Sequence, residues 1–469
     1  MSLTSLTYLI FLFICVCIYY ILPKQAKKIC LFSFSIFFYA CVMPKQLLIM
    51  MVYIWIIFLL GLAIFKAKRH NKLLLVTGIV LSVGFLFIYK YLNFTLSFFD
   101  YEGEGLSLIV PIGISYITFQ CISYLVEVYK GKMTVIRNPV SFFVYTLLFM
   151  KVTAGPIENP QTFFKELYSK KTIKWKGIMR AMMLIASGFV KKMVVADTLA
   201  PYIAGVIDSP AHKDGLSILL AVFMYSLQIY FDFSGYTDIA RGSAMMFGIS
   251  LTENFKHPYS SKSIREFWRR WHISLSEWLK NYVYFPLGGS KVGTVRRYLN
   301  LIIVFLVSGI WHGASLTFVL WGLLHGIYQV FEIALEPLMI NARKLLHIKE
   351  DGILHGIFAR IRTFVLVMLA WVFFRADSVS QAFMVIRQLF TPWANISLVY
   401  NNYLPDIKLL ILIIVAIIFV WIIEFIAKKN NKATSTALIV TAVSVWLVCI
   451  ALVFTSGTDT VNTFIYFDF

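Results

Sequence analysis

The stretch Tyr298-Leu-Asn-Leu-Ile-Ile-Val-Phe-Leu-Val-Ser-Gly-Ile-Trp-His-Gly-Ala-Ser315 is apolar enough to enter a membrane, yet a polar break interrupts it near its end. A second apolar run, 316–341, follows directly. Basic residues favour the cytoplasmic side, so Arg297 before the pair and Arg343 after it place both ends there. At about 1.5 Å per residue, His312 then lies about 22 Å into the membrane. The pair predicts a helical membrane protein with a polar group at depth.

Similar apolar runs fill the chain on both sides of this pair. Of the 469 residues, 59% are apolar and 14% are charged, against roughly 25% charged in soluble proteins. This composition excludes an ordinary soluble enzyme, a disordered chain, a disulfide-stapled secreted domain and a single-anchor protein. We predict an all-α polytopic membrane protein, a single domain over 1–469, with about 11–12 transmembrane helices plus re-entrant and interfacial helices. The other predicted spans are an N-terminal run, 30–42, 46–65, 73–98, 107–129, 178–200, 216–236, 357–374, 407–427 and 434–455.

The basic excess of the chain fits membrane topology better than nucleic-acid binding. Lys and Arg number 43 against 23 Asp and Glu, and they cluster between the apolar runs. Because the basic cluster 24–28 follows the first apolar run, we expect a retained first span rather than a cleaved signal peptide. The acidic patch 100–104 is expected outside, and the basic stretch 237–297 in the cytoplasm.

A short apolar run at 140–150 leads into Lys151-Val-Thr-Ala-Gly-Pro-Ile-Glu-Asn-Pro160, where two prolines and a glycine stop a helix. The clusters that flank this run, 130–137 and 165–180, are both basic and expected in the cytoplasm. Two successive cytoplasmic clusters around a short apolar run predict a re-entrant segment, which a membrane tolerates only inside protein or beside a water-filled cavity.

His312 is the first candidate functional residue. Gly309 and Gly313 flank it, and glycines let a helix break and let another chain or ligand approach closely. A neutral imidazole there can accept a proton. The alternative is a structural histidine at a helix contact, but a polar break at this depth favours function. His325, which follows farther along the same run, is interpreted as structural.

The second candidate is the segment 262–284, which reads as one amphipathic helix of the kind that lies in the membrane interface. Its apolar stripe comprises Ile264, Phe267, Trp268, Trp271, Leu275, Trp278, Leu279 and Tyr282. Its basic flank comprises Lys262, Arg265, Arg269 and Lys280, and His272 falls on the edge between the two. Two interpretations stay open: the flank contacts anionic lipid headgroups, or it holds a polyanionic cofactor at a cytoplasmic mouth.

The third candidate is the group Asp232, Asp238 and Arg241 at the end of a predicted span. Two acids near one arginine can form an internal ion-pair network, and we interpret it as a structural lock. The chain has no Gly-rich phosphate loop, no HExxH and no G-x-S-x-G elbow, and its six cysteines form no metal-ligand motif. We therefore expect no metal and no complete serine-based transferase.

Six motifs, in this order, resemble those of the membrane-bound O-acyltransferase (MBOAT) family, in the branch of the alginate and peptidoglycan O-acetyltransferases. The D-alanine exporter of teichoic acids is similar but more distant. The motifs cover about residues 110–330. They are Pro111-Ile-Gly-Ile-Ser-Tyr-Ile-Thr-Phe-Gln120, Ala154-Gly-Pro-Ile157, Gln228-Ile-Tyr-Phe-Asp-Phe-Ser-Gly-Tyr-Thr-Asp238, Phe267-Trp-Arg-Arg-Trp-His-Ile-Ser-Leu-Ser276, Tyr284-Phe-Pro-Leu-Gly-Gly289 and Gly309-Ile-Trp-His-Gly-Ala314.

The resemblance implies a ring of helices around a thin floor, with a funnel on each side. It implies acetyl transfer from cytoplasmic acetyl-CoA across the bacterial cytoplasmic membrane, completed on a polysaccharide by an extracytoplasmic SGNH-type partner protein. The two family histidines correspond to His312 and His272. We expect His312 to act as the general base, and His272 to orient the thioester or donate to the oxyanion. Arg265, Arg269 and Arg270 are the candidates for binding the phosphates of the coenzyme.

Other functions stay open at this point. A secondary transporter also places broken helices and charges at mid-membrane, although the hydropathy shows no inverted repeat. A non-enzymatic scaffold for a cell-wall complex is a third class, and a D-alanyl or other acyl donor is an alternative within the family. The acceptor, whether alginate, peptidoglycan or another polysaccharide, is not specified by the sequence.

Overall fold

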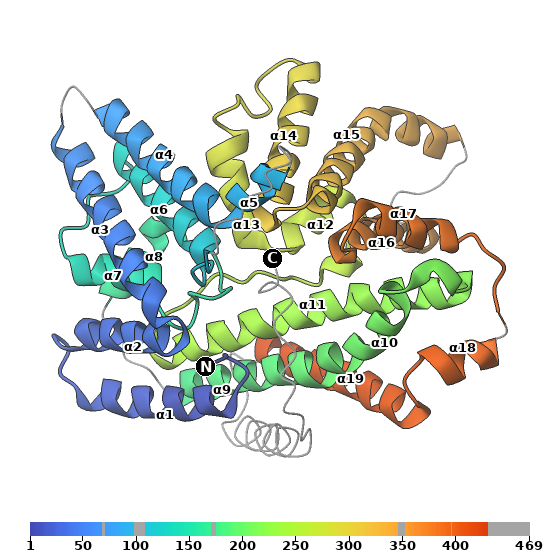
Figure 1. The fold of residues 1–469 in the computed structure, drawn as a ribbon, viewed down its shortest axis with the longest axis horizontal. Helices are drawn as coiled ribbons and strands as arrows, with labels where there is room; N and C mark the ends of the chain where they lie inside the picture. The colour runs from blue at the N-terminus through green and yellow to red at the C-terminus, as the bar shows by residue number, and fades with distance from the viewer. Residues whose placement is uncertain (68–70, 98–107, 170–174, 346–351, 395, 430–469) are drawn as a thin grey trace. The chain divides into compact units, whose positions relative to one another are not determined.

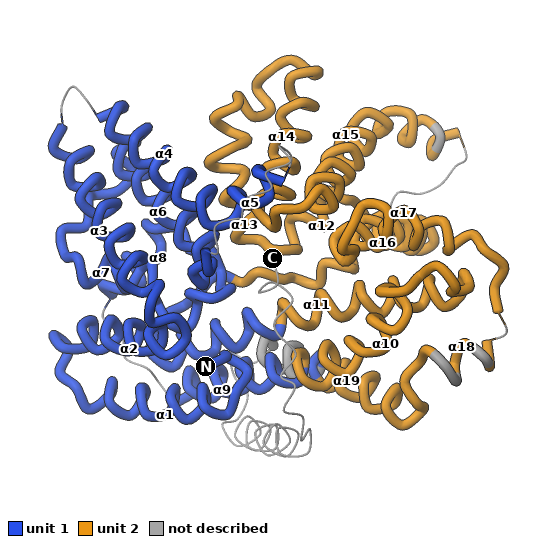
Figure 2. Tube along the Cα trace, in the orientation of Figure 1, with its two compact units in different colours: residues 1–190, 235–252, 420–461 blue, residues 191–234, 253–419, 462–469 orange. Residues whose placement is uncertain are grey.

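The computed structural model describes residues 1–67, 71–97, 108–169, 175–345, 352–394 and 396–429 (Figure 1). All regular elements within these ranges are helices, as predicted. The chain divides into two compact units (Figure 2). Unit 1 comprises residues 1–190, 235–252 and 420–461, and unit 2 comprises residues 191–234, 253–419 and 462–469.

Unit 1 is built from the N-terminal helices and from the second half of α11, Gly215–Met246. Two of its helices start at an Asn-Pro pair: the Asn138 side chain accepts from the Ser141 N–H, and the Asn159 side chain accepts from the Gln161 N–H. In both cases the proline occupies the first helical turn, where its missing N–H costs nothing. The helices are α1 Leu6–Ile21, α2 Lys27–Val42, α3 Pro44–Lys66, α4 Asn71–Lys90, α5 Leu92–Leu96, α6 Ile114–Tyr129, α7 Pro139–Leu147, α8 Pro160–Tyr168 and α9 Trp175–Phe189.

Unit 2 contains the first half of α11 and most of the C-terminal helices. Its longest adjacent helices, α14 Thr294–His312 and α15 Leu316–Leu345, pack along one another (Figure 1). The other helices are α10 Asp197–Ile207, α12 Ile264–Arg270, α13 Ile273–Leu279, α16 Ile353–Arg375, α17 Val379–Gln388, α18 Ile396–Tyr403 and α19 Ile407–Lys429, of which α19 continues into unit 1. Short π-helical turns cover Val190–Ala196 and Lys280–Tyr284, and 3-10 turns cover Pro210–His212 and Pro258–Ser260.

Six helices of the described residues, α3, α4, α11, α14, α15 and α16, are long and apolar enough to cross a membrane. This confirms a multi-pass membrane protein, with fewer long helices than the predicted 11–12 spans. The predicted spans 30–42 and 107–129 are the 16-residue helices α2 and α6, and 178–200 is divided between α9, a π-helical turn and α10. The predicted span 434–455 lies outside the described residues.

The segment between α7 and α8 has no helix, as its prolines and glycine predict. It is nonetheless buried in unit 1, and its charged groups find partners there. Lys151 Nζ donates to the Gln120 side-chain oxygen, and the Glu158 carboxylate accepts from the Thr252 N–H at 2.7 Å and from its hydroxyl at 3.1 Å. Irregular backbone at this position is therefore surrounded by protein, which is the condition for a re-entrant segment.

Candidate functional site

His312 is the last residue of α14, and the helix stops there because Gly313 adopts an extended conformation. Only 4% of His312 is exposed. Its imidazole lies among three aromatic rings, with ring centroids 5.0 Å from Trp311, 4.9 Å from Trp321 and 5.2 Å from Phe374. The position at a helix break and the burial agree with the sequence-based expectation for this residue.

Glycines set the distance between α14, which carries His312, and α15. A side-chain carbon built on Gly309 would lie 3.1 Å from the Phe318 carbonyl carbon, and one on Gly322 would lie 3.2 Å from the Gly309 Cα. The backbones of α14 and α15 are thus in direct contact, the arrangement that small residues permit between membrane helices. The close approach expected of Gly309 is made by α15.

His272 lies where the chain turns between α12 and α13, so the single helix predicted over 262–284 is wrong. The turn forms because His272 adopts a left-handed conformation with φ 43°, which histidine tolerates better than most residues. The apolar stripe is buried against protein instead of facing lipid, with Trp271 and Leu275 almost fully inaccessible. The short helices are therefore part of the core of unit 2.

The His272 side chain is fully buried, with 0% exposure. Its ring contacts Phe233 edge-to-face at 4.8 Å and Trp311 at 6.0 Å. Neither ring nitrogen has a hydrogen-bond partner among the residues that the structure describes. Burial lowers the pKa of His272 to about 3, so the ring is neutral at physiological pH.

A chain of ring contacts joins the two candidate histidines to a third. Trp311 touches both His272 and His312, and Trp321 touches both His312 and His325, the latter at 5.1 Å. His325 Nδ1 accepts a hydrogen bond of 3.2 Å from the Trp268 indole N–H. This bond agrees with the structural role expected for His325, because it ties α15 to α12.

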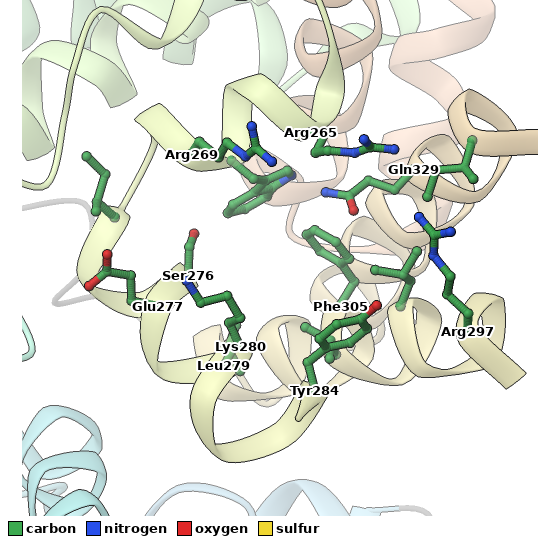
Figure 3. Close-up of a pocket in the computed structure, with 15 residues that line it drawn as sticks. Arg265, Arg269, Ser276, Glu277, Leu279, Lys280, Tyr284, Arg297, Phe305 and Gln329 are labelled. Atoms are coloured by element: carbon green, nitrogen blue, oxygen red, sulfur yellow. The ribbon is translucent and has the colours of Figure 1, made fainter. Parts of the chain in front are cut away.

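Unit 2 also contains a basic pocket of about 470 Å³ (Figure 3). Arg265 and Arg269 of α12 lie on one side, Arg297 of α14 and Gln329 of α15 continue the wall, and Glu277 lies across from them (Figure 3). Trp268 and Phe305 also line the pocket, and both touch His325. The remaining lining residues are Ile273, Ser276, Leu279, Lys280, Tyr284, Leu301, Val304 and Ile333.

The structure brings only two of the three predicted phosphate-binding arginines to this pocket. Arg265 and Arg269 line it, whereas Arg270 points elsewhere on α12. The Arg270 guanidinium pairs with Glu266 at 2.6 Å and donates to the Ser260 hydroxyl at 2.8 Å. Neither His312 nor His272 lines the pocket.

The sequence pattern did not single out two residues of this region. Arg297 adds a third guanidinium to the pocket, although in the sequence it indicates only membrane topology. Glu332, one of two acids in the predicted span 316–341, accepts from the Ile264 and Arg265 N–H groups, each at 3.1 Å. Its carboxylate holds the first turn of α12, and an acid inside a predicted span was the signal that could have identified it.

Asp232, Asp238 and Arg241, the third candidate group, all take part in ion pairs. In unit 1, Arg241 Nη1 donates to Asp238 at 3.2 Å. In unit 2, Asp232 pairs with Lys192 at 2.5 Å, and Lys192 also contacts Asp197 at 2.8 Å. Each of these ion pairs lies within its own unit, and both agree with the interpretation of a structural role.

Comparison of the sequence with known proteins shows that it is similar to acyltransferases. The family model described as MBOAT, membrane-bound O-acyltransferase family, matches residues 128–376, a range that includes His272, His312 and the pocket. The chain is 34% identical over 406 residues to the peptidoglycan O-acetyltransferase of Helicobacter pylori, covering 79% of this chain and 76% of that protein.

Two further relatives differ in their acyl group or polymer. The chain is 34% identical over 391 residues to the probable alginate O-acetylase AlgI of Azotobacter vinelandii, covering 80% of this chain and 74% of that protein. It is 29% identical over 298 residues to the teichoic acid D-alanyltransferase of Bacillus subtilis, covering 60% of this chain and 74% of that protein. All three names describe transfer of an acyl group to a polymer.

Proposed function

The chain belongs to the membrane-bound O-acyltransferase family, and from this premise we propose that it transfers acetyl groups from cytoplasmic acetyl-CoA across the membrane for O-acetylation of a cell-surface polysaccharide. The observation that carries the proposal is the similarity, over about four fifths of the chain, to O-acetyltransferases of peptidoglycan and alginate. Membership alone makes the chain a membrane-bound acyltransferase. The donor, the base and the direction of transfer are the proposed parts.

The basic pocket supports coenzyme A as the carrier of the acyl group. Coenzyme A is polyanionic, and guanidinium groups bind phosphate through charge-assisted, often bidentate hydrogen bonds. Arg265, Arg269 and Arg297 supply three such groups in one pocket. Arg270 is not part of the proposed donor site, because its guanidinium is held by Glu266 and Ser260.

The position of His312 supports its role as general base. In the proposed step, the His312 imidazole takes the proton of the acceptor hydroxyl, and the hydroxyl oxygen attacks the thioester carbonyl carbon. The new C–O bond forms, the C–S bond breaks, and the departing thiolate receives the proton from the imidazolium. His272, neutral and one indole ring away from His312, is the proposed donor to the oxyanion or the group that orients the thioester.

The acceptor side of the proposal rests on the relatives. Their names specify peptidoglycan and alginate, so a polysaccharide outside the bacterial cytoplasmic membrane is the proposed final acceptor. Because this chain has no serine elbow motif, we propose that an extracytoplasmic SGNH-type partner completes the transfer. The D-alanyltransferase relative supports a second candidate, D-alanyl transfer to a cell-wall polymer.

The test uses purified full-length protein in lipid nanodiscs with radiolabelled acetyl-CoA and the periplasmic fraction of the source organism as the source of acceptor. We expect release of coenzyme A together with label in the acceptor fraction, and loss of both in His312→Ala. His212→Ala, which removes an exposed histidine in a 3-10 turn, is the matched control and should behave as wild type.

Two outcomes would contradict the proposal. Undiminished coenzyme A release by a folded His312→Ala variant refutes the general base. Transfer from a D-alanyl donor but not from acetyl-CoA replaces the first candidate by the second.

A further inference from the structure

The first turn of α13 is capped from outside its own segment. Helices begin with N–H groups that lack intrahelical partners, and the residue at the N-cap position normally accepts from one of them. Here His272 occupies the N-cap position, yet its side chain makes no capping bond. The first turn therefore depends on another residue.

That residue is Asn254, which lies in an extended stretch before α12 in the sequence. Its backbone carbonyl accepts from the Ile273 N–H at 3.1 Å, and its side-chain Oδ1 accepts from the Ser274 N–H at 3.1 Å. The nearby Lys256 N–H donates to the Arg270 carbonyl at 2.9 Å. The segment that contains Asn254 and Lys256 is therefore hydrogen-bonded to the chain both before and after His272. Only 1% of Asn254 is exposed.

Ring packing holds the same junction. Phe255, the next residue after Asn254, contacts Trp271 at 4.9 Å and Phe233 at 5.0 Å. Phe233 is the ring that also contacts His272. Asn254, through its hydrogen bonds, and Phe255, through its ring contacts, thus hold the turn formed by Trp271 and His272.

We propose that Asn254 is a positioning residue for acyl transfer: by capping α13 in place of His272, it leaves the His272 imidazole available to the reacting group. This inference rests on the proposed function for its catalytic meaning. Without the Asn254 side chain, the Ser274 N–H loses its bond to Oδ1, and His272 stands at the N-cap position, from which a side chain normally accepts that bond. A ring engaged in that bond is withdrawn from the substrate.

The experiment combines activity with a measurement that does not require activity. The variants are Asn254→Ala, Asn254→Asp, His272→Gln and the double variant of the first and third. Asn159→Ala is the matched control, because it removes a side-chain cap of α8 that also serves two backbone N–H groups. For each protein we measure kcat and KM for acetyl-CoA, thermal unfolding, and amide hydrogen exchange of a peptide covering 271–279.

We expect Asn254→Ala to lower kcat by about 10- to 100-fold with KM for acetyl-CoA changed less than about three-fold, because a displaced group loses its orientation. Asn254→Asp keeps the Oδ1 acceptor and should recover most of that loss. In the His272→Gln background, Asn254→Ala should cost less than about three-fold more, because two residues that act through one group are non-additive. Exchange over 271–279 should accelerate in Asn254→Ala and not in Asn159→Ala.

Three results would overturn the inference: multiplicative losses in the double variant, an Asn254→Asp variant as impaired as Asn254→Ala, or unchanged exchange over 271–279. Absence of acetyl transfer by the wild type is a different failure. It refutes the proposed function, while the exchange data still decide whether Asn254 holds the turn.

Discussion

Replacing Gly309 by alanine tests whether the contact between α14 and α15 sets the position of His312. The new methyl carbon would lie 3.1 Å from the Phe318 carbonyl carbon and closer than 3.0 Å to its oxygen, a separation that real side chains essentially never show. The obstacle is backbone, so no side chain can rotate away. The helices must therefore move apart at this point, and overpacking of this kind costs about 1–3 kcal/mol of stability.

The catalytic effect should exceed the effect on stability. His312 follows Gly309 by one turn at the end of the same helix, so a shift of α14 moves the imidazole with it. A displacement approaching 1 Å can reduce a rate by about 100-fold. We therefore expect kcat for acetyl transfer to fall by about 30- to 100-fold, while the protein still purifies as a folded monodisperse species.

The assay is steady-state coenzyme A release together with thermal unfolding in the same detergent. Gly205→Ala is the control, because a side-chain carbon there meets no atom within 4 Å. It lies in α10 and should leave activity unchanged and stability equal or raised by up to about 1 kcal/mol. A Gly309→Ala enzyme with kcat within three-fold of wild type would show that this helix contact does not position the base.

Three further predictions concern α12 and α13. Arg265→Ala should raise KM for acetyl-CoA by about ten-fold or more, since a charge-assisted hydrogen bond contributes about 1.5–3 kcal/mol. Arg270→Ala, the control, should leave KM unchanged. Equal KM values for the two variants would argue against the pocket as the donor site. Glu332→Ala removes the acceptor of two α12 N–H groups, so it should lower the free energy of unfolding by about 1.5–3 kcal/mol in denaturation assays and also raise KM, with Glu332→Gln intermediate. Burial lowers the pKa of His272 to about 3, so below about pH 6.5 the unfolded chain binds a proton that the folded chain does not. As the pH is lowered from there, this residue therefore decreases the free energy of unfolding by about 1.4 kcal/mol per pH unit. Thermal unfolding of His272→Gln should therefore depend less steeply on pH between about 6.5 and 4.5 than that of wild type, and parallel profiles would contradict this burial.

Local sequence signals were sufficient to predict the helix ends that a nearby glycine or proline determines. Glycine and proline predicted the end of α14 beside His312 and the helix-free segment before α8. Arg265 and Arg269 could be assigned to one basic flank because residues four apart share a helix face. The same rule applies to Glu266 and Arg270, and their ion pair removes Arg270 from the pocket.

The break at His272 could not be predicted in this way. No glycine or proline lies between Ile264 and Leu279, and the hydrophobic periodicity continues through the turn. The left-handed turn at His272 is held by tertiary hydrogen bonds that Asn254 accepts from the Ile273 and Ser274 N–H groups, and helical periodicity does not register such bonds. The partner of Asp232 was missed for the same reason, because Lys192 is brought to it by folding and not by spacing along one helix.

The aromatic rings around His312 also have a consequence for the chemistry of the donor. A thioester is as open to attack by water as by an alcohol, and water is far more concentrated than any acceptor. Trp311, Trp321 and Phe374 leave little room for solvent beside the imidazole. In the proposed reaction, an acceptor alcohol beside this ring would therefore meet little competition from water, and the enclosure would favour acyl transfer over hydrolysis of the thioester.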